Sequence, residues 1–167
     1  MEKVYYCAVG SWLGKLYIAS TEKGLCRIAF EGEEDEFFQW LTRQFGSENL
    51  VEDESKNGLA SEQLKDYLAG GRREFALSVD LRGTAFQKAV WGELMRIPYG
   101  VTVSYKEVAE RIGKPAAIRA VGSANGANPI PIVIPCHRVV GSDGSLTGYS
   151  AGLEIKKALL RLEGVDF

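Results

Sequence analysis

SYKEVAERIGKPAAIRAVGSAN, residues 104–125, predicts two short helices that are separated by a tight turn. Ser104 and Glu107 have the spacing of a capping box, in which the two side chains satisfy backbone N–H groups at the start of a helix. Gly113 ends this first helix. The second is expected over Pro115–Asn125, because proline is well tolerated in the first turn of a helix. The pattern is that of a helix-turn-helix, but taken alone it favours two ordinary core helices joined by a tight turn.

The second of these helices has little side-chain bulk. Ala120, Gly122 and Ser123 follow Arg119, whose long cationic side chain stands among small residues. A nearly bare helix face can approach another surface closely, whether protein or DNA backbone, and the cation in its middle favours nucleic acid. Close packing between two helices explains the small residues as well.

IPIVIPCHRVV, residues 130–140, brings a cysteine together with the only histidine of the chain. A thiol attacks as its thiolate, so a reactive Cys136 needs a base nearby. On an extended segment Cys136 and His137 point to opposite sides, and we expect a bridging water rather than direct contact. A carboxylate would hold the imidazole, and the residues alone leave its identity open. Taken singly, Cys136 fits a buried structural thiol; the block Pro135–Arg138 favours a reactive one.

Helices are expected on both sides of these segments. Thr84 can cap a helix whose apolar residues share one face and which ends before Pro98. A last helix is expected over Glu154–Leu162. The residues placed on the inner faces of these two helices are Phe86, Val90 and Leu94 in the first and Ile155, Leu159 and Leu162 in the second.

The first half of the chain has β-type segments punctuated by glycines, which favour a small antiparallel meander. The segments expected here are strands Val4–Ala8, Lys15–Ala19, Leu25–Phe30 and Phe75–Leu81 and helices Glu36–Phe45 and Leu59–Ala69. The sequence thus predicts a mixed α/β (α+β) fold. A small N-terminal sheet-plus-helix domain, residues 1–81, precedes a mostly helical C-terminal domain, residues 82–167, that carries the helix-turn-helix.

Composition sets broad limits on the setting of the protein. The 167 residues are 46% hydrophobic and 25% charged, as in a globular protein with a core, and no long apolar run or signal peptide is present. Three separated cysteines do not make a disulfide framework, so a reducing cytoplasm is expected. The net charge is −5 over residues 1–79 and +3 over 80–167. Only the second half can attract phosphate, and weakly; on charge alone, a chance imbalance of solvated surface charge is the favoured explanation.

Many short blocks, in matching order, make residues 83–167 resemble the O6-alkylguanine-DNA alkyltransferases, also called methylated-DNA–protein-cysteine methyltransferases. The first half matches through Leu13–Leu16 and Gly24-Leu25. The blocks of the second half are Gly83–Gln87, Val90-Trp91, Ile97–Gly100, Ser104-Tyr105, Arg119–Gly122, Asn128-Pro129, Ile134–Val139, Gly148–Ser150, Lys156 and Leu159–Gly164.

The resemblance implies a single-turnover transfer of the alkyl group from O6 of guanine, with O4-alkylthymine as a further substrate to consider. Cys136 resembles the acceptor, His137 its base acting through water, and Glu163 the acid that orients His137. Tyr105 resembles the residue that protonates N3 of the leaving guanine. The implied substrate contacts are the Cys136 and Val139 carbonyls, the Ser150 amide, the Tyr149 wall and the hinge residue Asn128.

For DNA, the resemblance implies that Arg119 fills the space of a nucleotide rotated out of the duplex. Ala120, Gly122 and Ser123 would then lie in the minor groove. The expected partner is double-stranded DNA carrying O6-alkylguanine, bound by a monomer, with cooperative assembly left open and no membrane. No cofactor or metal is expected, since zinc sites of the family use Cys and His in the first half, where this chain has no histidine. The chain departs from the family pattern at Ala151-Gly152 and at Gly126.

Three other classes of protein compete with this reading. A non-catalytic relative that only binds alkylated DNA lacks the cysteine that Cys136 supplies. A helix-turn-helix regulator reads the major groove with bulky polar side chains, and residues 116–124 are mostly small. A cysteine hydrolase needs an oxyanion hole and direct nucleophile–base contact, which adjacent Cys136 and His137 fit poorly.

Overall fold

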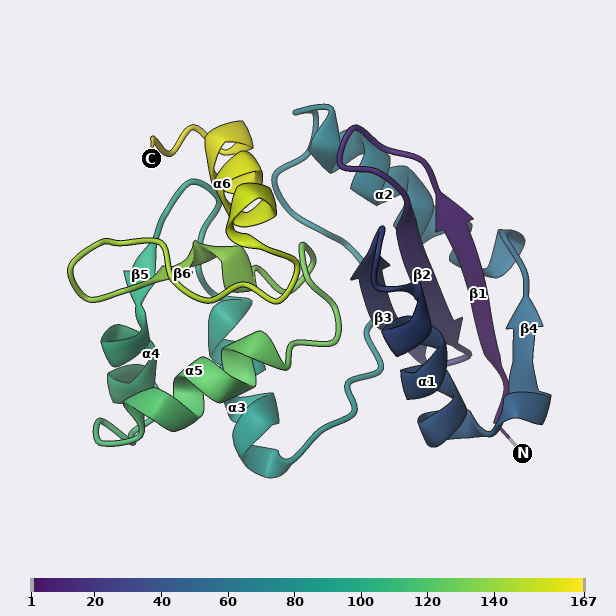
Figure 1. The fold of residues 1–167 in the computed structure, drawn as a ribbon, viewed down its shortest axis with the longest axis horizontal. Coiled ribbons are helices and arrows are strands. Elements are labelled where there is room, and N and C mark those ends of the chain that lie inside the picture. The colour runs from purple at the N-terminus through teal and green to yellow at the C-terminus, as the bar shows by residue number, and fades with distance from the viewer. Residues whose placement is uncertain (1, 167) are drawn as a thin grey trace. The chain divides into compact units, whose positions relative to one another are not determined.

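A computed structural model describes residues 2–166, which divide into two units at the Leu81–Arg82 bond. The first unit is built on a four-stranded sheet of order β3-β2-β1-β4 (Figure 1). Its elements are β1 (Val4–Val9), β2 (Leu16–Thr21), β3 (Gly24–Phe30), α1 (Glu34–Phe45), η1 (Ser47–Asn49), β4 (Leu50–Glu52), η2 (Ser55–Asn57) and α2 (Gly58–Leu68). The expected antiparallel meander is β1-β2-β3, and β4, which the sequence did not indicate, pairs parallel with β1.

Helices cover both faces of this sheet (Figure 1). α1 places Phe37, Leu41 and Phe45 against Val4 and Ala19 on one face. α2 buries its own apolar stripe, including Leu64 and Tyr67, in the core. A sheet that is covered on both faces needs apolar residues at successive positions, and β3 is buried from Leu25 to Phe30. Cys7 and Cys26 are buried strand residues without disulfides.

The predicted strand Phe75–Leu81 is wrong: only Val79 forms an isolated bridge, with Leu25. The backbone of Ala76 is satisfied by the Gln63 side chain instead, with Nε2 donating to the carbonyl at 3.1 Å and Oε1 accepting from the amide at 2.9 Å. A Cβ on Gly24 would stand 2.5 Å from the Ser78 carbonyl oxygen. The absence of a side chain there lets the connector run close to β3.

The second unit is mostly helical and contains one short parallel pair of strands (Figure 1). Its elements are α3 (Ala85–Leu94), β5 (Val103–Ser104), α4 (Tyr105–Arg111), α5 (Ile118–Gly126), η3 (Cys136–Arg138), β6 (Val139–Val140) and α6 (Leu153–Leu162). Thr84 and Ser104 form the two expected capping contacts, with Gln87 and Glu107 as partners. β5 pairs with β6, Val103 opposite Val139. This pairing sets the start of α4 beside the Cys136 turn.

Two expectations for these helices need correction. α5 begins at Ile118 rather than Pro115, because Lys114–Ala117 forms a β-turn in which the Ala117 amide donates to the Lys114 carbonyl at 2.9 Å. Proline favours the second position of such a turn as strongly as the first turn of a helix. In α6, Leu159 is buried as expected, but Ile155 and Leu162 are only half-buried. The buried stripe is instead Lys156, Leu159, Leu160 and Glu163.

Candidate active site and DNA-facing helix

Cys136 stands on a tight bend rather than on the expected extended segment. Pro135 has φ −79° and ψ 64°, and the Cys136 amide donates to the Ile134 carbonyl at 2.7 Å, which closes an inverse γ-turn. Residues 136–138 then form the 3₁₀ turn η3. Side chains that follow each other on a 3₁₀ turn point about 120° apart, since it has about three residues per turn. The thiol and the imidazole therefore still point in different directions.

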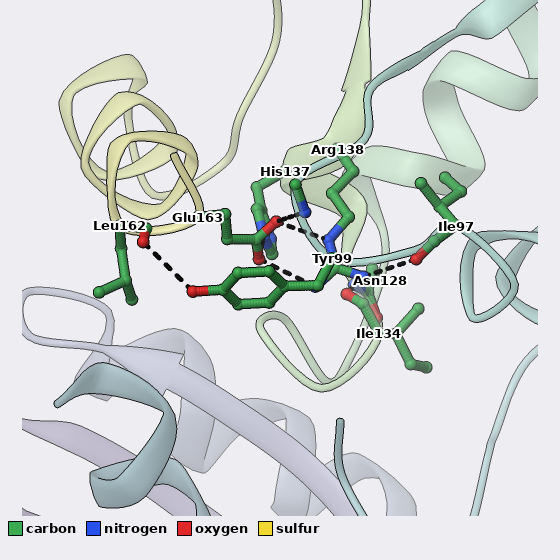
Figure 2. Close-up of polar contacts among 9 residues, drawn as sticks. Ile97, Tyr99, Asn128, Ile134, His137, Arg138, Leu162 and Glu163 are labelled. Carbon is green, nitrogen blue, oxygen red and sulfur yellow. Dashed lines mark hydrogen bonds and ion pairs between the residues drawn. The ribbon is translucent and has the colours of Figure 1, made fainter. Parts of the chain in front are cut away.

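Asn128 ties together the loop that precedes the cysteine (Figure 2). Its Nδ2 donates to the Ile134 carbonyl at 2.8 Å and its Oδ1 accepts from the Ile130 amide at 3.0 Å. Within this loop Ile132 has φ 76°, a strained value for a β-branched residue, held by the surrounding contacts. The loop that carries Cys136 is thus fixed at its base by one buried amide.

Glu163 is the acid that faces His137, at 2.8 Å between Oε2 and Nε2 (Figure 2). Arg138 binds the same carboxylate in a two-pronged pair, Nε to Oε1 and Nη2 to Oε2, both at 2.9 Å. The Gly100 amide donates to Oε1 at 3.0 Å. Four donors around one buried carboxylate favour its ionised form.

This arrangement selects the protonation state of His137. The carboxylate of Glu163 accepts from Nε2, so the neutral imidazole carries its proton there and leaves Nδ1 as the basic nitrogen. Burial lowers the pKa of His137, while the hydrogen bond and charge of Glu163 oppose that change. The resting imidazole is therefore neutral and able to accept a proton at Nδ1.

Cys136 is 4% exposed. Burial raises the pKa of its thiol, and a hydrogen bond from Asn128, the charge of Lys156 and a hydrogen bond from Tyr149 oppose the rise. The structure thus brings three predicted site residues, Asn128, Tyr149 and Cys136, together. The resting group is a thiol, so nucleophilic attack requires proton transfer to be coupled to it.

Tyr105, the first residue of α4, donates from its hydroxyl to the Thr147 carbonyl at 3.1 Å. Burial raises the pKa of this phenol, which keeps it protonated and able to donate. Its ring lies 4.0 Å from where a Cβ on Gly122 would stand, an ordinary contact distance, so the start of α4 packs beside α5 at this position.

The loop after β6 carries the other predicted substrate contacts. Its neighbour Val139 accepts at its carbonyl from Nζ of Lys156 at 2.6 Å. Ser150 is exposed, and no interaction connects its side chain to Cys136. The structure therefore brings Tyr105, Val139 and Tyr149 around Cys136, while Ser150 lies exposed on the loop that follows β6.

On α5, Arg119, Ala120 and Ser123 are exposed and Gly122 is half-buried against α4. The predicted DNA-facing residues thus share one accessible side of a helix. The Trp91 indole holds the opposite side by donating to the Ala124 carbonyl at 2.8 Å. Ile118, which the sequence analysis did not single out, is 41% exposed beside Arg119.

Several supporting residues were missed at the sequence level. Arg138 also donates to the Ile97 carbonyl at 2.6 Å, and Tyr99 donates to the Leu162 carbonyl at 3.2 Å (Figure 2). The Ile97–Gly100 turn thus supports Glu163. A cation directly after Cys136-His137 and an acid at the end of the last helix were the available signals for this pair. Lys156 gave no signal beyond its place in a matched block.

Among residues 2–166, no cluster of His, Cys, Asp or Glu has the arrangement of a metal site. Across the same residues, no helix combines the length and the apolar character that a membrane span requires.

Both halves of the chain match known family descriptions. Residues 4–81 match "6-O-methylguanine DNA methyltransferase, ribonuclease-like domain", and residues 85–165 match "6-O-methylguanine DNA methyltransferase, DNA binding domain". The class of protein is therefore a two-part DNA alkyltransferase with a DNA-binding second half.

Whole-chain relatives agree. The inducible methylated-DNA–protein-cysteine methyltransferase of Bacillus subtilis is 49% identical, over 88% of this chain and 83% of its own. The Methanosarcina barkeri protein of that name is 46% identical, over 96% and 97%. A crystal structure of Mycobacterium tuberculosis OGT in complex with DNA superposes with a TM-score of 0.83 and 43% identity, over 95% and 92%. The chain belongs to the O6-methylguanine DNA methyltransferase family, whose members repair DNA by direct transfer of the alkyl group to protein.

Proposed function

We propose that Cys136 is the residue that accepts the alkyl group from O6-alkylguanine in double-stranded DNA, once per molecule. The observation that supports this role most directly is the 2.8 Å contact between Nε2 of His137 and the buried Glu163 carboxylate. It provides a neutral base, with its Nε2 proton held by a carboxylate, one residue from the thiol. Cys7 and Cys26 stand on strands of the other unit and have no such partner set.

The transfer begins with the thiol proton. Cys136 passes it through a water to Nδ1 of His137, and the carboxylate of Glu163, which Arg138 holds in place, stabilises the resulting imidazolium. The sulfur forms a bond to the alkyl carbon while the bond from that carbon to O6 breaks, and its electron pair goes to the guanine. Tyr105 donates a proton to N3 and recovers one by way of His137. The products are a thioether on Cys136 and an unmodified guanine.

The base is held beside the sulfur by groups of the surrounding walls. The carbonyls of Cys136 and Val139 accept from the guanine amino group, and the Ser150 amide donates to O6. Tyr149 closes one wall. Asn128 keeps the acceptor turn in register with the end of α5, through its contacts at Ile134 and Ile130.

The DNA is bound by the second unit as a monomer, with residues 2–81 as a supporting domain. The net positive charge of residues 80–167 and the exposed Arg119 on a small-residue helix support this division of roles. Arg119 occupies the space of the nucleotide that is rotated out, and Ala120, Gly122 and Ser123 lie in the minor groove. A reducing cytoplasm suits an acceptor that must stay a free thiol.

Incubation with duplex DNA that carries a labelled O6-methyl group tests the proposal. We expect one label per chain, on Cys136. Cys136→Ser should take up no label, because serine's hydroxyl is far less acidic than a thiol, and it should still bind DNA. Label on Cys7 or Cys26 would overturn the assignment. Binding without any transfer would favour a DNA-binding relative or a regulator, and release of methanol into solution would favour a hydrolase.

A further inference from the structure

Asn125, in the last turn of α5, carries a buried amide that the proposed reaction does not use. The residue is 2% exposed, and its Nδ2 donates to the Cys136 carbonyl at 3.4 Å. Among residues 2–166, no donor lies within hydrogen-bond distance of its Oδ1, although that oxygen is shielded from bulk solvent. A buried carbonyl oxygen without a donor costs stability, so this oxygen calls for a reason other than packing.

The orientation of this amide is determined by its partner. A backbone carbonyl can only accept, so the amide turns its nitrogen toward the Cys136 oxygen, and Oδ1 points away from that oxygen. The carbonyl belongs to the peptide bond between Cys136 and His137, the two residues that exchange a proton in the proposed reaction. The Asn125 amide therefore lies against the bond that joins the proposed acceptor to its base.

A second asparagine takes the other side of the cysteine. Asn128 makes a hydrogen bond to the Cys136 sulfur and holds the Ile134 carbonyl at 2.8 Å. Its Oδ1 accepts from the Ile130 amide, so both ends of the Asn128 amide are bonded. Only Asn125, of these two, keeps a buried oxygen that can accept a further hydrogen bond.

The proton relay of the proposed function requires a water that is held in place. Such a water accepts from the Cys136 thiol and donates one hydrogen to Nδ1 of His137, and its second hydrogen needs another acceptor. Buried waters typically make about three hydrogen bonds to protein groups. Two groups bridged by a water are about 5–6 Å apart, so an amide in contact with the Cys136–His137 peptide bond is within reach.

We propose that Oδ1 of Asn125 binds the relay water, which makes Asn125 a positioning residue for the deprotonation of Cys136. The inference rests on the proposed function. The water donates one hydrogen to Oδ1 and the other to Nδ1 of His137, so a lone pair of its oxygen faces the thiol. As the thiol proton moves to the water, the hydrogen that faces His137 passes to Nδ1. The water is left unchanged, still bonded to Asn125, and Cys136 is left as the thiolate.

Asn125→Leu tests this, because leucine has the same branching at Cγ but neither donates nor accepts. Gly126→Ala, at the next position of α5, is the matched control, since Gly126 is exposed and an added Cβ meets no other part of the protein within 4 Å. Three quantities are measured at pH 7 and at pH 9. They are the concentration of free O6-benzylguanine that gives half the maximal rate, the limiting rate, and the rate at which iodoacetamide alkylates Cys136. The melting temperature is recorded for each variant.

We expect Asn125→Leu to lower the limiting rate at pH 7 about tenfold, which corresponds to about 1.4 kcal/mol and is within the range of one hydrogen bond. The iodoacetamide rate should fall by a similar factor, because that reagent also needs the thiolate. The half-saturating concentration should stay within about twofold, since the relay does not hold the base. At pH 9 both deficits should shrink to about threefold or less, because more of the thiol ionises without the relay. Gly126→Ala should match the unmodified protein throughout.

The charged and titratable groups around this relay are Glu163, Arg138, Lys156 and Tyr105. All four are retained in Asn125→Leu, so their own titration is common to both proteins. Unchanged rates in this variant would overturn the inference. So would a higher half-saturating concentration at a constant limiting rate, which would place Asn125 at the guanine contact. A deficit of the same size at both pH values would also overturn it, because it would make the role of Asn125 structural.

Asn125→Ala gives the same test should the leucine variant fail to fold, because it removes the amide without adding bulk. The limiting and iodoacetamide rates at pH 7 should fall here too, and unchanged rates would again overturn the inference. Failure of the unmodified protein to take up benzyl on Cys136 would instead refute the proposed function, so the two failures are distinct.

Discussion

At the scale of single residues, the site depends on how one carboxylate is shared. Glu163 receives both Arg138 contacts, the His137 contact and the Gly100 amide. Arg138 neutralises the charge of Glu163 without displacing His137, because its fork occupies one side of each oxygen. The carboxylate is thereby fixed in a single orientation, and it fixes the imidazole in turn. The base is organised before any substrate arrives.

Glu163→Gln should therefore damage both stability and reaction. It leaves the Arg138 guanidinium buried without its anion, which typically costs about 3–5 kcal/mol, and it no longer selects the Nε2-protonated imidazole. Urea unfolding and the rate of benzyl transfer near neutral pH measure the two effects. Glu154→Gln, exposed on the same helix, should change stability by about 0.5 kcal/mol or less. Normal transfer by Glu163→Gln would remove this acid from the mechanism.

The buried Lys156 gives a pH prediction whose sign is determined by its pKa. Burial lowers the pKa of Lys156 from 10.5 to about 8, so between these values the unfolded chain binds a proton that the folded chain has released. The contribution of Lys156 to the free energy of unfolding should therefore rise with pH across that window, by at most about 1.4 kcal/mol per pH unit. The Lys156 ammonium interacts electrostatically with three titratable groups: Cys136 on η3, the adjacent His137, and the ring of Tyr105 on α4.

To measure this, the unfolding free energies of the protein with and without Lys156→Met are compared in a Cys136→Ala background, which removes the titrating thiol. Tyr105 and His137 are then common to both proteins, with and without Lys156→Met. The difference between their unfolding free energies should shift in favour of the lysine protein from pH 8 to pH 10. A difference that does not depend on pH would show that Lys156 is not desolvated in the folded chain.

At the scale of elements, the residues that carried clear local signals were predicted correctly. The cap at Thr84 and the Ser104–Glu107 capping box formed as expected, and Gln87 completes a second box at Thr84, because these hydrogen bonds are local and need no tertiary partner. The strand predicted over residues 75–81 does not form, because the backbone N–H and C=O of Ala76 are bonded to the side chain of Gln63, thirteen positions away. β4 was missed for the same kind of reason: three residues pair with β1 through a contact distant in sequence.

The last helix shows how a site can be hidden in a periodic pattern. The buried positions 156, 159, 160 and 163 have the i, i+3, i+4, i+7 spacing of a core face, but a lysine begins the series and a glutamate ends it. When the buried face of this helix is predicted from its apolar residues alone, Ile155 and Leu162 are chosen, but the structure shows both to be half-buried. The two charged members are the ones that contact Val139 and His137. Glu163 was assigned through family resemblance, and Lys156 became interpretable from its contacts.

α5 supplies a prediction about the role of a single cation on a small-residue face. Arg119→Ala should slow repair of duplex DNA by about tenfold to a hundredfold, because rotating a base out of the stack costs a few kcal/mol that the side chain partly offsets. Reaction with free O6-benzylguanine should be nearly unchanged, since the free base needs no rotation. Lys114→Ala, an exposed cation in the preceding turn, is the control for charge alone and should slow duplex repair much less. Equal losses on both substrates for Arg119→Ala would place this residue in the pocket or in folding.

At the scale of the whole molecule, the proposed acceptor is linked to α5, the helix that we propose faces DNA. The Asn125 amide of α5 donates to the Cys136 carbonyl at 3.4 Å, and Asn128, just after α5, holds the Ile134 carbonyl. A change at the sulfur should therefore affect the packing of the whole second unit and not only the Cys136 side chain. This unit pairs its chemistry with its DNA contact, while the first unit, net negative over residues 1–79, offers little attraction to phosphate.

The reaction should accordingly consume the protein and then weaken it. A thioether is a poor leaving group, and among residues 2–166 no second cysteine lies beside Cys136 to remove the alkyl group, so uptake should plateau at one per chain. The added carbon enters a site that is 4% exposed, on a segment whose neighbouring residues Ile134 and Val139 are themselves buried. Overpacking of that kind costs about 1–3 kcal/mol, and the hydrogen bonds from Asn128 and Tyr149 to sulfur are weakened as well. Calorimetry of the methylated and free proteins should show a melting temperature lower by several degrees after methylation, at about 2–4 °C per kcal/mol for a chain of this size, and lower again after benzylation. Repeated turnover would mean that alkylated Cys136 is not the end of the reaction. A methylated form that melts higher than the free protein would mean that the site accommodates the added carbon without overpacking.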